Sequence, residues 1–296
     1  MAALLLGAAA IAFAPIFVRL SELGPTATAF WRLAFSLPVL WLWYAIQQRG
    51  QSSSKHQGAP ADRIGFILAG LFFAGDLALW HWSLRLTSVA NATLLPNFAP
   101  VFVTLAGFLL FGEKFSKLFL AGMAIAISGA VVLMGESLDL GPRHLLGDAL
   151  ALATALFYAG YIVCVGRLRA RHGTARIMAW SGLATCVALL PVALASRESL
   201  IPETARGWAV LLALGLFSHA LGQSLIAYAL AHLPAAFSSV GLLLQPALAA
   251  VLAWLLLAEP ISAWQGAGAI VILAGIVLAR RGTRRHLAGR SPRPAA

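Results

Sequence analysis

The residues of this chain whose types could do chemistry are polar side chains inside long apolar segments. Counting along helices at about 1.5 Å per residue places six of them at, or within about one turn of, the middle of a membrane. The six are Asp76, Asn97, Tyr158, His219, Gln223 and Gln245. Polar groups in lipid are costly and normally face protein or a water-filled cavity. Their convergence at one depth therefore predicts a central site that binds substrate.

Asp76 is an acid in the middle of a span. On a helix it shares a face with Trp80 and Ser83, which follow at spacings of four and seven. Asp76 could carry a proton or balance the ammonium group of a substrate. The alternatives are a structural acid paired with Arg32 and an acid that burial keeps neutral. We expect Asp76 and Trp80 to contact the substrate.

Two further groups of polar side chains accompany this acid. His219 and Gln223 are one turn apart, so together they could contact a carboxylate or an amine. The alternative for His219 is a hydrogen bond to a neighbouring carbonyl. Thr154, Tyr158 and Tyr161 form one helical stripe that could line an aromatic cavity or serve helix packing.

The composition shows which solvent surrounds these segments. Of the 296 residues, 60% are hydrophobic and 10% are charged, too few charges to cover a soluble domain of this size. Ten apolar runs are long enough to cross a bilayer as helices. We place them at 3–20, 26–46, 64–86, 89–112, 117–134, 146–166, 174–196, 207–230, 235–257 and 262–280. The chain is therefore predicted to be an all-α integral membrane protein.

The last third of the chain repeats its middle at an offset of 146 residues without gaps. The matching pairs are Pro100 and Pro246, Glu113 and Glu259, Ser116 and Ser262, Gly122 and Gly268, and Gly129 and Gly275. We expect Pro100 and Pro246 to act as paired hinges, with static kinks as the alternative. Each glutamate precedes a serine that is placed to cap the following helix, and a carboxylate there favours the positive helix end, so we expect both glutamates to be structural. The glycines predict close helix packing away from the substrate path.

Five spans per copy force the second copy to enter the membrane upside down, which gives inverted repeats over 1–140 and 141–280. With the N-terminus inside, 15 of the 21 Lys and Arg residues lie in inner loops or the basic stretch 281–296. That bias predicts that both termini are cytoplasmic. We expect 281–296 to be a disordered cytoplasmic tail. Inverted halves that open alternately to opposite faces are an architecture for transport.

Residues 98–133 and 244–279 resemble the two copies of the EamA domain of the drug/metabolite transporter superfamily. Each copy is similar to that domain in its early proline, its glutamate at the hairpin and its glycine-rich fifth helix. Arg32 in AFWRLAF, and Gly147 with Asp148, also match the family, although Arg32 has no counterpart in the second copy. The resemblance implies ten helices, a central cavity and export or exchange of small metabolites. The aromatic-rich spans look most like the YddG-type amino-acid exporters.

Other classes of protein lack support in the sequence. HExxH, GxSxG and paired mid-membrane acids are absent, so we expect no enzyme, catalytic residue, metal or cofactor. An ion channel would need a ring of like charges or a filter sequence. The net charge of +11 arises in loops and the tail, which fits membrane topology better than nucleic-acid binding.

A cavity of Trp, Tyr, neutral polar groups and one acid suits a small zwitterion with an apolar side chain. A sugar nucleotide would need several basic groups. We therefore expect a monomeric exporter of neutral or aromatic amino acids in the bacterial inner (cytoplasmic) membrane, working by alternating access. Protons could drive it through Asp76, or transport could be facilitated diffusion. The main alternative is a proton-coupled multidrug or other metabolite exporter.

Overall fold

In the computed structural model, the described residues are those outside 50–59, 88, 135–143, 258–260 and 289–296. Every regular element among them is a helix. Ten helical segments are long and apolar enough to cross a membrane, which confirms the ten predicted spans. They are Ala2–Leu20, Pro25–Arg49, Asp62–Ser83, Asn91–Phe111, Lys117–Met134, Leu145–Leu168, Thr174–Ala195, Ala205–Ala229, Ala235–Leu256 and Ala263–Arg284. The chain is an all-α, multi-pass membrane protein.

Six of the ten spans are single helices. They are α3 (Pro25–Arg49), α4 (Pro60–Leu86), α7 (Lys117–Met134), α8 (Leu145–Leu168), α9 (Thr174–Ala195) and α14 (Ala263–Ala288). Helix α14 continues into the basic stretch 281–296, so the expectation of disorder there is wrong as far as Ala288. The rest of that stretch, like Glu259, lies outside the described residues.

The other four spans are interrupted within the membrane. They comprise α1 (Ala2–Ala12) with α2 (Ala14–Leu20); α5 (Val89–Leu94), η1 (Leu95–Phe98) and α6 (Ala99–Phe111); α10 (Ala205–Ala213), η4 (Leu214–Gln223) and α11 (Ser224–Ala229); and α12 (Ala235–Leu242) with α13 (Leu244–Leu257). Pro15, Pro100 and Pro246 lie near three of these breaks, where a proline removes a backbone donor. The fourth break is η4, a π-helix, a form that is frequent at functional sites.

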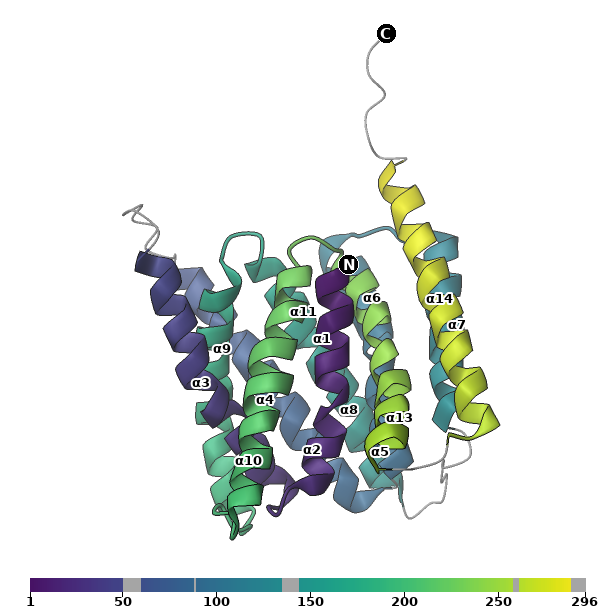
Figure 1. The fold of residues 1–296 in the computed structure, drawn as a ribbon. Helices are drawn as coiled ribbons and strands as arrows, with labels where there is room; N and C mark the ends of the chain where they lie inside the picture. Colours follow the sequence, from purple (N-terminus) through teal and green to yellow (C-terminus); the bar gives the residue numbers. More distant parts are fainter. Residues whose placement is uncertain (50–59, 88, 135–143, 258–260, 289–296) are drawn as a thin grey trace.

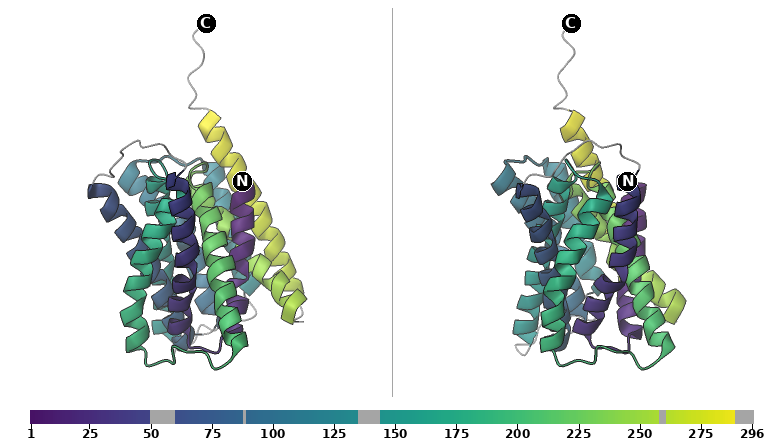
Figure 2. Two further views of the ribbon diagram at one scale, coloured as in Figure 1. Left: turned by 60° about the vertical axis from the view of Figure 1, so that its left-hand side comes forward. Right: turned by 90° about the vertical axis from the view of Figure 1, so that its left-hand side faces the viewer.

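The helices stand side by side in one bundle. The start of α1 and the end of α14 lie at the same end of that bundle (Figure 1), as an even number of crossings requires. Figure 2 shows the same alignment of the helices from two further directions. We call the end at which α1 begins and α14 ends the terminal face, and the opposite end the far face.

Helices α7 and α14 pack closely through the glycines of the repeat. A Cβ atom added to Gly122 would lie 2.3 Å from the backbone nitrogen of Ala279, and one added to Gly268 would lie 2.5 Å from that of Leu133. Only glycine permits backbones to approach this closely. The predicted close packing of these two spans is thus confirmed, and neither helix lines the central cavity described below.

The pairing of helices repeats between the two halves of the chain. Helix α4 packs on α8, and η4 of the second half packs on α1. In the same way α6 packs on α8, and α13 packs on α1. In the order of spans within each half, α8 corresponds to α1, α4 to η4, and α6 to α13. Each contact therefore has an equivalent in which the two halves exchange roles. The opposite insertion of the two halves stays a prediction.

Candidate substrate cavity

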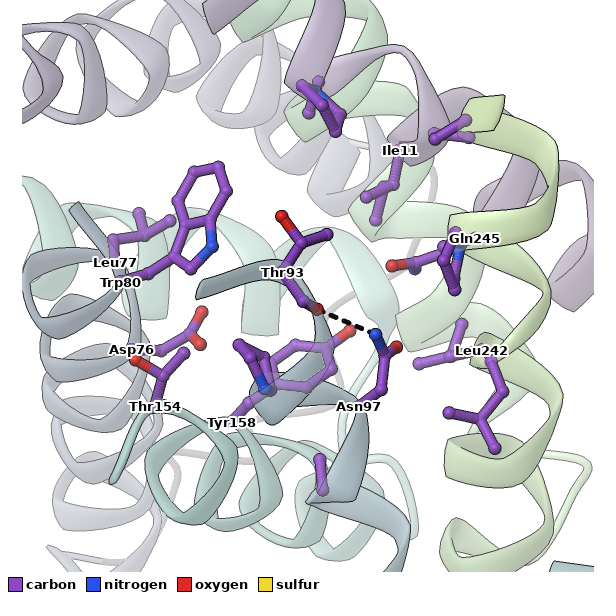
Figure 3. Close-up of a pocket in the computed structure, with 18 of the residues that line it drawn as sticks. Ile11, Asp76, Leu77, Trp80, Thr93, Asn97, Thr154, Tyr158, Leu242 and Gln245 are labelled. Atoms are coloured by element: carbon purple, nitrogen blue, oxygen red, sulfur yellow. Dashed lines mark hydrogen bonds between the residues drawn. The ribbon is translucent and has the colours of Figure 1, made fainter. Parts of the chain in front are cut away.

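A cavity of about 180 Å³ lies inside the bundle where the interrupted spans meet. Acidic, aromatic and amide side chains from α4, α8, η1 and α13 converge on it (Figure 3). Its polar lining residues are Arg32, Asp76, Trp80, Thr93, Asn97, Thr154, Tyr158, Gln223, Ser239 and Gln245. Five of the six mid-membrane polar residues singled out from the sequence therefore face one space. Their roles in binding stay predictions.

The cavity lining contains one acid and one base, Asp76 of α4 and Arg32 of α3. Arg32 is only 7% exposed, and Asp76 is half-buried. Within the described part of the chain the two form no ion pair with each other, and the Asp76 carboxylate accepts no hydrogen bond. Charges act more strongly in such low-dielectric surroundings than at the surface. Both groups are therefore available to opposite charges on a ligand.

Nitrogen donors accompany the acid. Among the described residues, Arg32 Nε, Gln223 Nε2 and Gln245 Nε2 are buried and donate no hydrogen bond. Gln223 is 1% exposed, and its side chain also faces the hydroxyls of Tyr158 and Tyr161. Buried donors normally have partners, and these three lie beside a cavity in which a ligand or a water molecule could accept their hydrogen bonds. Three such donors suit a carboxylate.

Helix contacts hold the aromatic and amide walls in place. Trp80 Nε1 donates to the carbonyl of Ala92 at 3.1 Å, which ties α4 to the broken fourth span. Asn97 Nδ2 donates to the carbonyl of Thr93 at 2.8 Å, leaving its side-chain oxygen toward the cavity side of the helix (Figure 3). The Tyr158 ring stacks on Tyr161 with centroids 6.1 Å apart. These contacts orient the aromatic rings before any ligand binds.

His219 lies apart from the other predicted site residues. It is 1% exposed, does not line the cavity, and its ring lies 5.3 Å from that of Phe73. Gln223, one turn further along the π-helix η4, does line the cavity. Only Gln223 of this pair therefore lies where a substrate in the cavity could contact it.

Both predicted hinge prolines line the cavity. Pro100 begins α6 directly after the 3-10 turn, and Pro246 lies in the first turn of α13 after the break at Leu243. The repeat thus places matching interruptions in two spans that both line the site. Movement about them stays a prediction.

Arg32 was not among the residues predicted to bind substrate, yet it lines the same cavity as Asp76. The available signal was that it is a basic residue in the middle of a span, where such residues are rare. Its direction could not be read from the sequence because the side chain points toward a cavity that other helices create.

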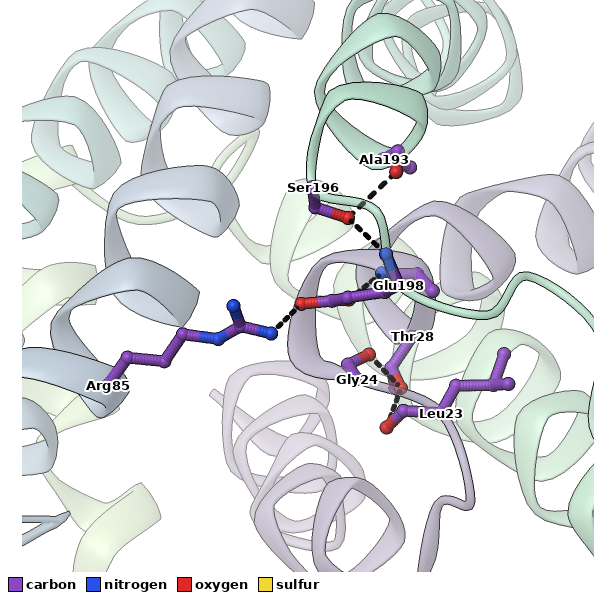
Figure 4. A network of polar contacts seen from close by, with 8 residues as sticks. Leu23, Gly24, Thr28, Arg85, Ala193, Ser196 and Glu198 are labelled. Atoms are coloured by element: carbon purple, nitrogen blue, oxygen red, sulfur yellow. Dashed lines mark hydrogen bonds and ion pairs between the residues drawn. The ribbon is translucent and has the colours of Figure 1, made fainter.

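A polar network joins the spans at the far face (Figure 4). The Glu198 carboxylate pairs with Arg85 and accepts a hydrogen bond at 2.9 Å from the backbone of Ala27, near the start of α3. Glu22 does the same for α10, since it accepts hydrogen bonds from the backbone of Glu203 and from Thr204. Carboxylates at helix N-termini are stabilising. Glu198 and Glu22 therefore each connect a loop on this face to the start of a neighbouring helix, α3 and α10 respectively.

Comparison with known proteins relates this chain to transporters. The model of the EamA-like transporter family matches residues 1–135 and 145–281. The chain is 26% identical over 253 residues to the pseudopaline exporter CntI of Pseudomonas aeruginosa, covering 85% of this chain and 84% of that protein. It is 30% identical over 208 residues to the probable terminal-alkyne amino-acid exporter of Streptantibioticus cattleyicolor, covering 69% and 68%.

Two further comparisons agree with these. The chain is 28% identical over 228 residues to the threonine/homoserine exporter RhtA of Escherichia coli, covering 76% of this chain and 72% of that protein. A solved crystal structure superimposes with a TM-score of 0.80 at 20% identity, covering 96% of this chain and 98% of that one. At that identity the superposition shows the fold alone.

Proposed function

The chain belongs to the EamA-like transporter family, and we propose that it exports neutral or aromatic amino acids across the bacterial inner membrane by alternating access. Family membership makes it a transporter of small molecules rather than an enzyme. The observation that carries the choice of substrate is the division of charge in the cavity. One carboxylate, Asp76, is accompanied by unpartnered donors from Arg32, Gln223 and Gln245.

An amino acid presents both charges that this cavity would recognise. Its ammonium group would pair with Asp76, and its carboxylate would accept hydrogen bonds from Arg32 and the two amides. A sugar nucleotide would require more than one base, and Arg32 is the single basic residue of the lining. The remaining walls are mostly apolar, with Trp80 and Tyr158 placed to contact a hydrophobic side chain.

The size of the cavity favours a single small metabolite. About 180 Å³ is close to the volume of about 150 Å³ that accommodates benzene in a protein core. It is below the range of about 300–1,000 Å³ typical of sites for drug-sized ligands. Two relatives whose names include amino-acid export support the same class of substrate.

The proposal of alternating access depends on how the two halves of the chain are related to each other. We propose that 1–140 and 141–280 are inverted repeats with both termini in the cytoplasm, as the distribution of Lys and Arg favours. The two stretches matched by the family model, the recurring helix contacts and the matching breaks at Pro100 and Pro246 support this arrangement. Broken spans around a central site are typical of transporters that open to one face at a time.

Uptake of labelled amino acids into proteoliposomes tests the substrate. We expect neutral and aromatic amino acids to be transported and to compete with one another. Transport of cationic drugs without transport of any amino acid would overturn the substrate assignment and favour the multidrug alternative. Running the panel with and without a pH gradient decides between proton coupling and facilitated diffusion.

Replacing Asp76 by Asn tests the role of the acid. A hydrogen bond to a charged group contributes about 1.5–3 kcal/mol, so we expect the KM for amino acids to rise by roughly 10- to 100-fold. Asp62→Asn is the matched control, because Asp62 lies on the same helix but pairs with His172 at the terminal face. Equal KM values for the two variants would exclude Asp76 as the ammonium partner. Loss of gradient-driven uptake in Asp76→Asn alone would assign proton coupling to this carboxylate.

A further inference from the structure

A second cavity, also of about 180 Å³, opens at the terminal face. We call it the terminal-face cavity. Its walls come from the end of α6, the end of α8, the loop before α12 and the start of α12. The residues that matter here are Val103, Gly107, Phe111, Glu113, Arg167 and Ala235. Phe111 is 39% exposed, and Glu113 and Arg167 are also exposed, so the cavity is open at the surface of the bundle.

The two cavities are stacked along the same three helices. On α6, Pro100 lines the central cavity and Val103 lines the terminal-face cavity, about 4.5 Å further along the axis. On α12, Ser239 and Ala236 have the same relation. Between these levels Ile162 of α8 and Phe237 of α12 are at most 2% exposed. Buried apolar side chains therefore occupy positions between the two cavities on α8 and α12.

The terminal-face cavity holds one acid and one base, as the central cavity does. Glu113 and Arg167 both line it, and within the described residues they form no ion pair with each other. The Arg167 guanidinium carbon instead lies 3.4 Å from the centroid of the Phe111 ring, a cation–π contact that orients it. The opposite charges of Glu113 and Arg167 therefore line the same cavity without pairing with each other.

Glu113 is folded back toward this space. Its backbone N–H donates to the carbonyl of Gly107 at 2.9 Å, and Gly112 adopts the left-handed conformation with φ of 63°. A Cβ atom on Gly107 would lie 2.8 Å from Glu113 Oε2. The carboxylate therefore packs directly against the backbone of α6, at a position where glycine has no side chain. The side chain of Ser116, rather than Glu113, caps the next helix by accepting from the backbone of Phe119 at 3.1 Å.

We infer that the terminal-face cavity is a second binding site for zwitterionic amino acids, in which Glu113 pairs with the ammonium group and Arg167 with the carboxylate. The inference rests on the proposed function, because it concerns the same substrates on their way to the central cavity. The site binds weakly, since exposed ion pairs contribute at most about 1 kcal/mol each. Weak binding at an entrance permits the substrate to move on to the deeper site.

Protection of an introduced thiol from a maleimide tests the second site on the full-length purified chain. Ala235→Cys reports on the terminal-face cavity and Ala249→Cys on the central one, since each residue lines the named space. The native thiols Cys164 and Cys186 are removed in both proteins, because both are free. The probes are L-phenylalanine, L-leucine and L-threonine. Phenylalaninamide lacks the carboxylate, and N-acetylphenylalanine lacks the ammonium group.

We expect the three amino acids to protect both reporters, and the two derivatives to protect the Ala235→Cys reporter up to about fivefold less well. Glu113→Gln and Arg167→Gln each raise the half-protecting concentration at Ala235→Cys about fivefold and leave Ala249→Cys unchanged. Asp76→Asn has the reverse pattern, which excludes an indirect effect of the central cavity. Both charged side chains are exposed, so these variants should fold, which gel filtration checks.

Two results would overturn the inference. One is protection at Ala249→Cys without protection at Ala235→Cys, which leaves the proposed function standing with one site. The other is protection at Ala235→Cys that neither charge-removing variant weakens. Protection at Ala235→Cys together with absent uptake of every amino acid would instead refute the proposed function and retain the site.

Discussion

Gly275→Ala tests the close packing of α7 on α14 that sets the edge of the bundle. A Cβ atom at Gly275 would lie 2.4 Å from the backbone nitrogen of Ala126, and an ordinary contact begins at 3.4 Å. The two backbones must therefore separate by about 1 Å, because a backbone atom cannot rotate aside as a side chain can. Overpacking of this kind costs about 1–3 kcal/mol, and the better helix propensity of alanine offsets up to about 1 kcal/mol. We expect a net loss of about 1–2 kcal/mol.

Thermal unfolding of the purified protein in detergent measures this loss. A destabilisation of that size should lower the Tm by on the order of 5 °C. Gly266→Ala is the matched control on the same helix, because a Cβ atom there meets nothing within 4 Å. It should leave the Tm unchanged or raise it slightly. If Gly275→Ala proved as stable as Gly266→Ala, the argument for backbone contact between these helices would fail.

The remaining predictions concern the hinges and the far face. Pro100→Ala and Pro246→Ala should each lower kcat by roughly tenfold, whereas Pro38→Ala, inside the continuous helix α3, should not; unchanged turnover in all three would indicate static kinks. The hydrogen bond from the Thr204 side chain holds the pKa of Glu22 below its usual 4.5. A depressed pKa means stability that is present above about pH 4.5 and lost as the pH falls through the folded value. Glu22→Gln should therefore flatten the fall of Tm in acid; parallel curves for both proteins would contradict this.

The spans and the depth of the site could be predicted because both follow from distance along the chain. Apolar runs of membrane length are visible directly, and counting at a fixed rise per residue locates Asp76, Asn97, Tyr158, Gln223 and Gln245 at one level. All five line the central cavity. The glycines at matching positions likewise predicted the pairing of α7 with α14, since small residues serve mainly close approach.

The direction in which a side chain points was harder to predict. An α-helical count puts His219 and Gln223 on one face, but only Gln223 lines the cavity, because the neighbouring helices decide which part of that face meets it. The expected serine cap is confirmed at Ser116, whereas the Glu113 carboxylate lies against Gly107 of α6. Both positions depend on how neighbouring segments pack, which residue spacing does not reveal.

The sequence by itself determined that this chain crosses the membrane ten times, that its halves are related, and which polar residues share a depth. These properties depend on the order of residues and on the cost of polar groups in lipid. Only the tertiary structure decided that Arg32 and Asp76 line one cavity, and that Glu113 and Arg167 line a second one. A cavity is the space left between helices that are distant in the chain. Its charges can be assigned only when the rotation of every helix about its axis is known.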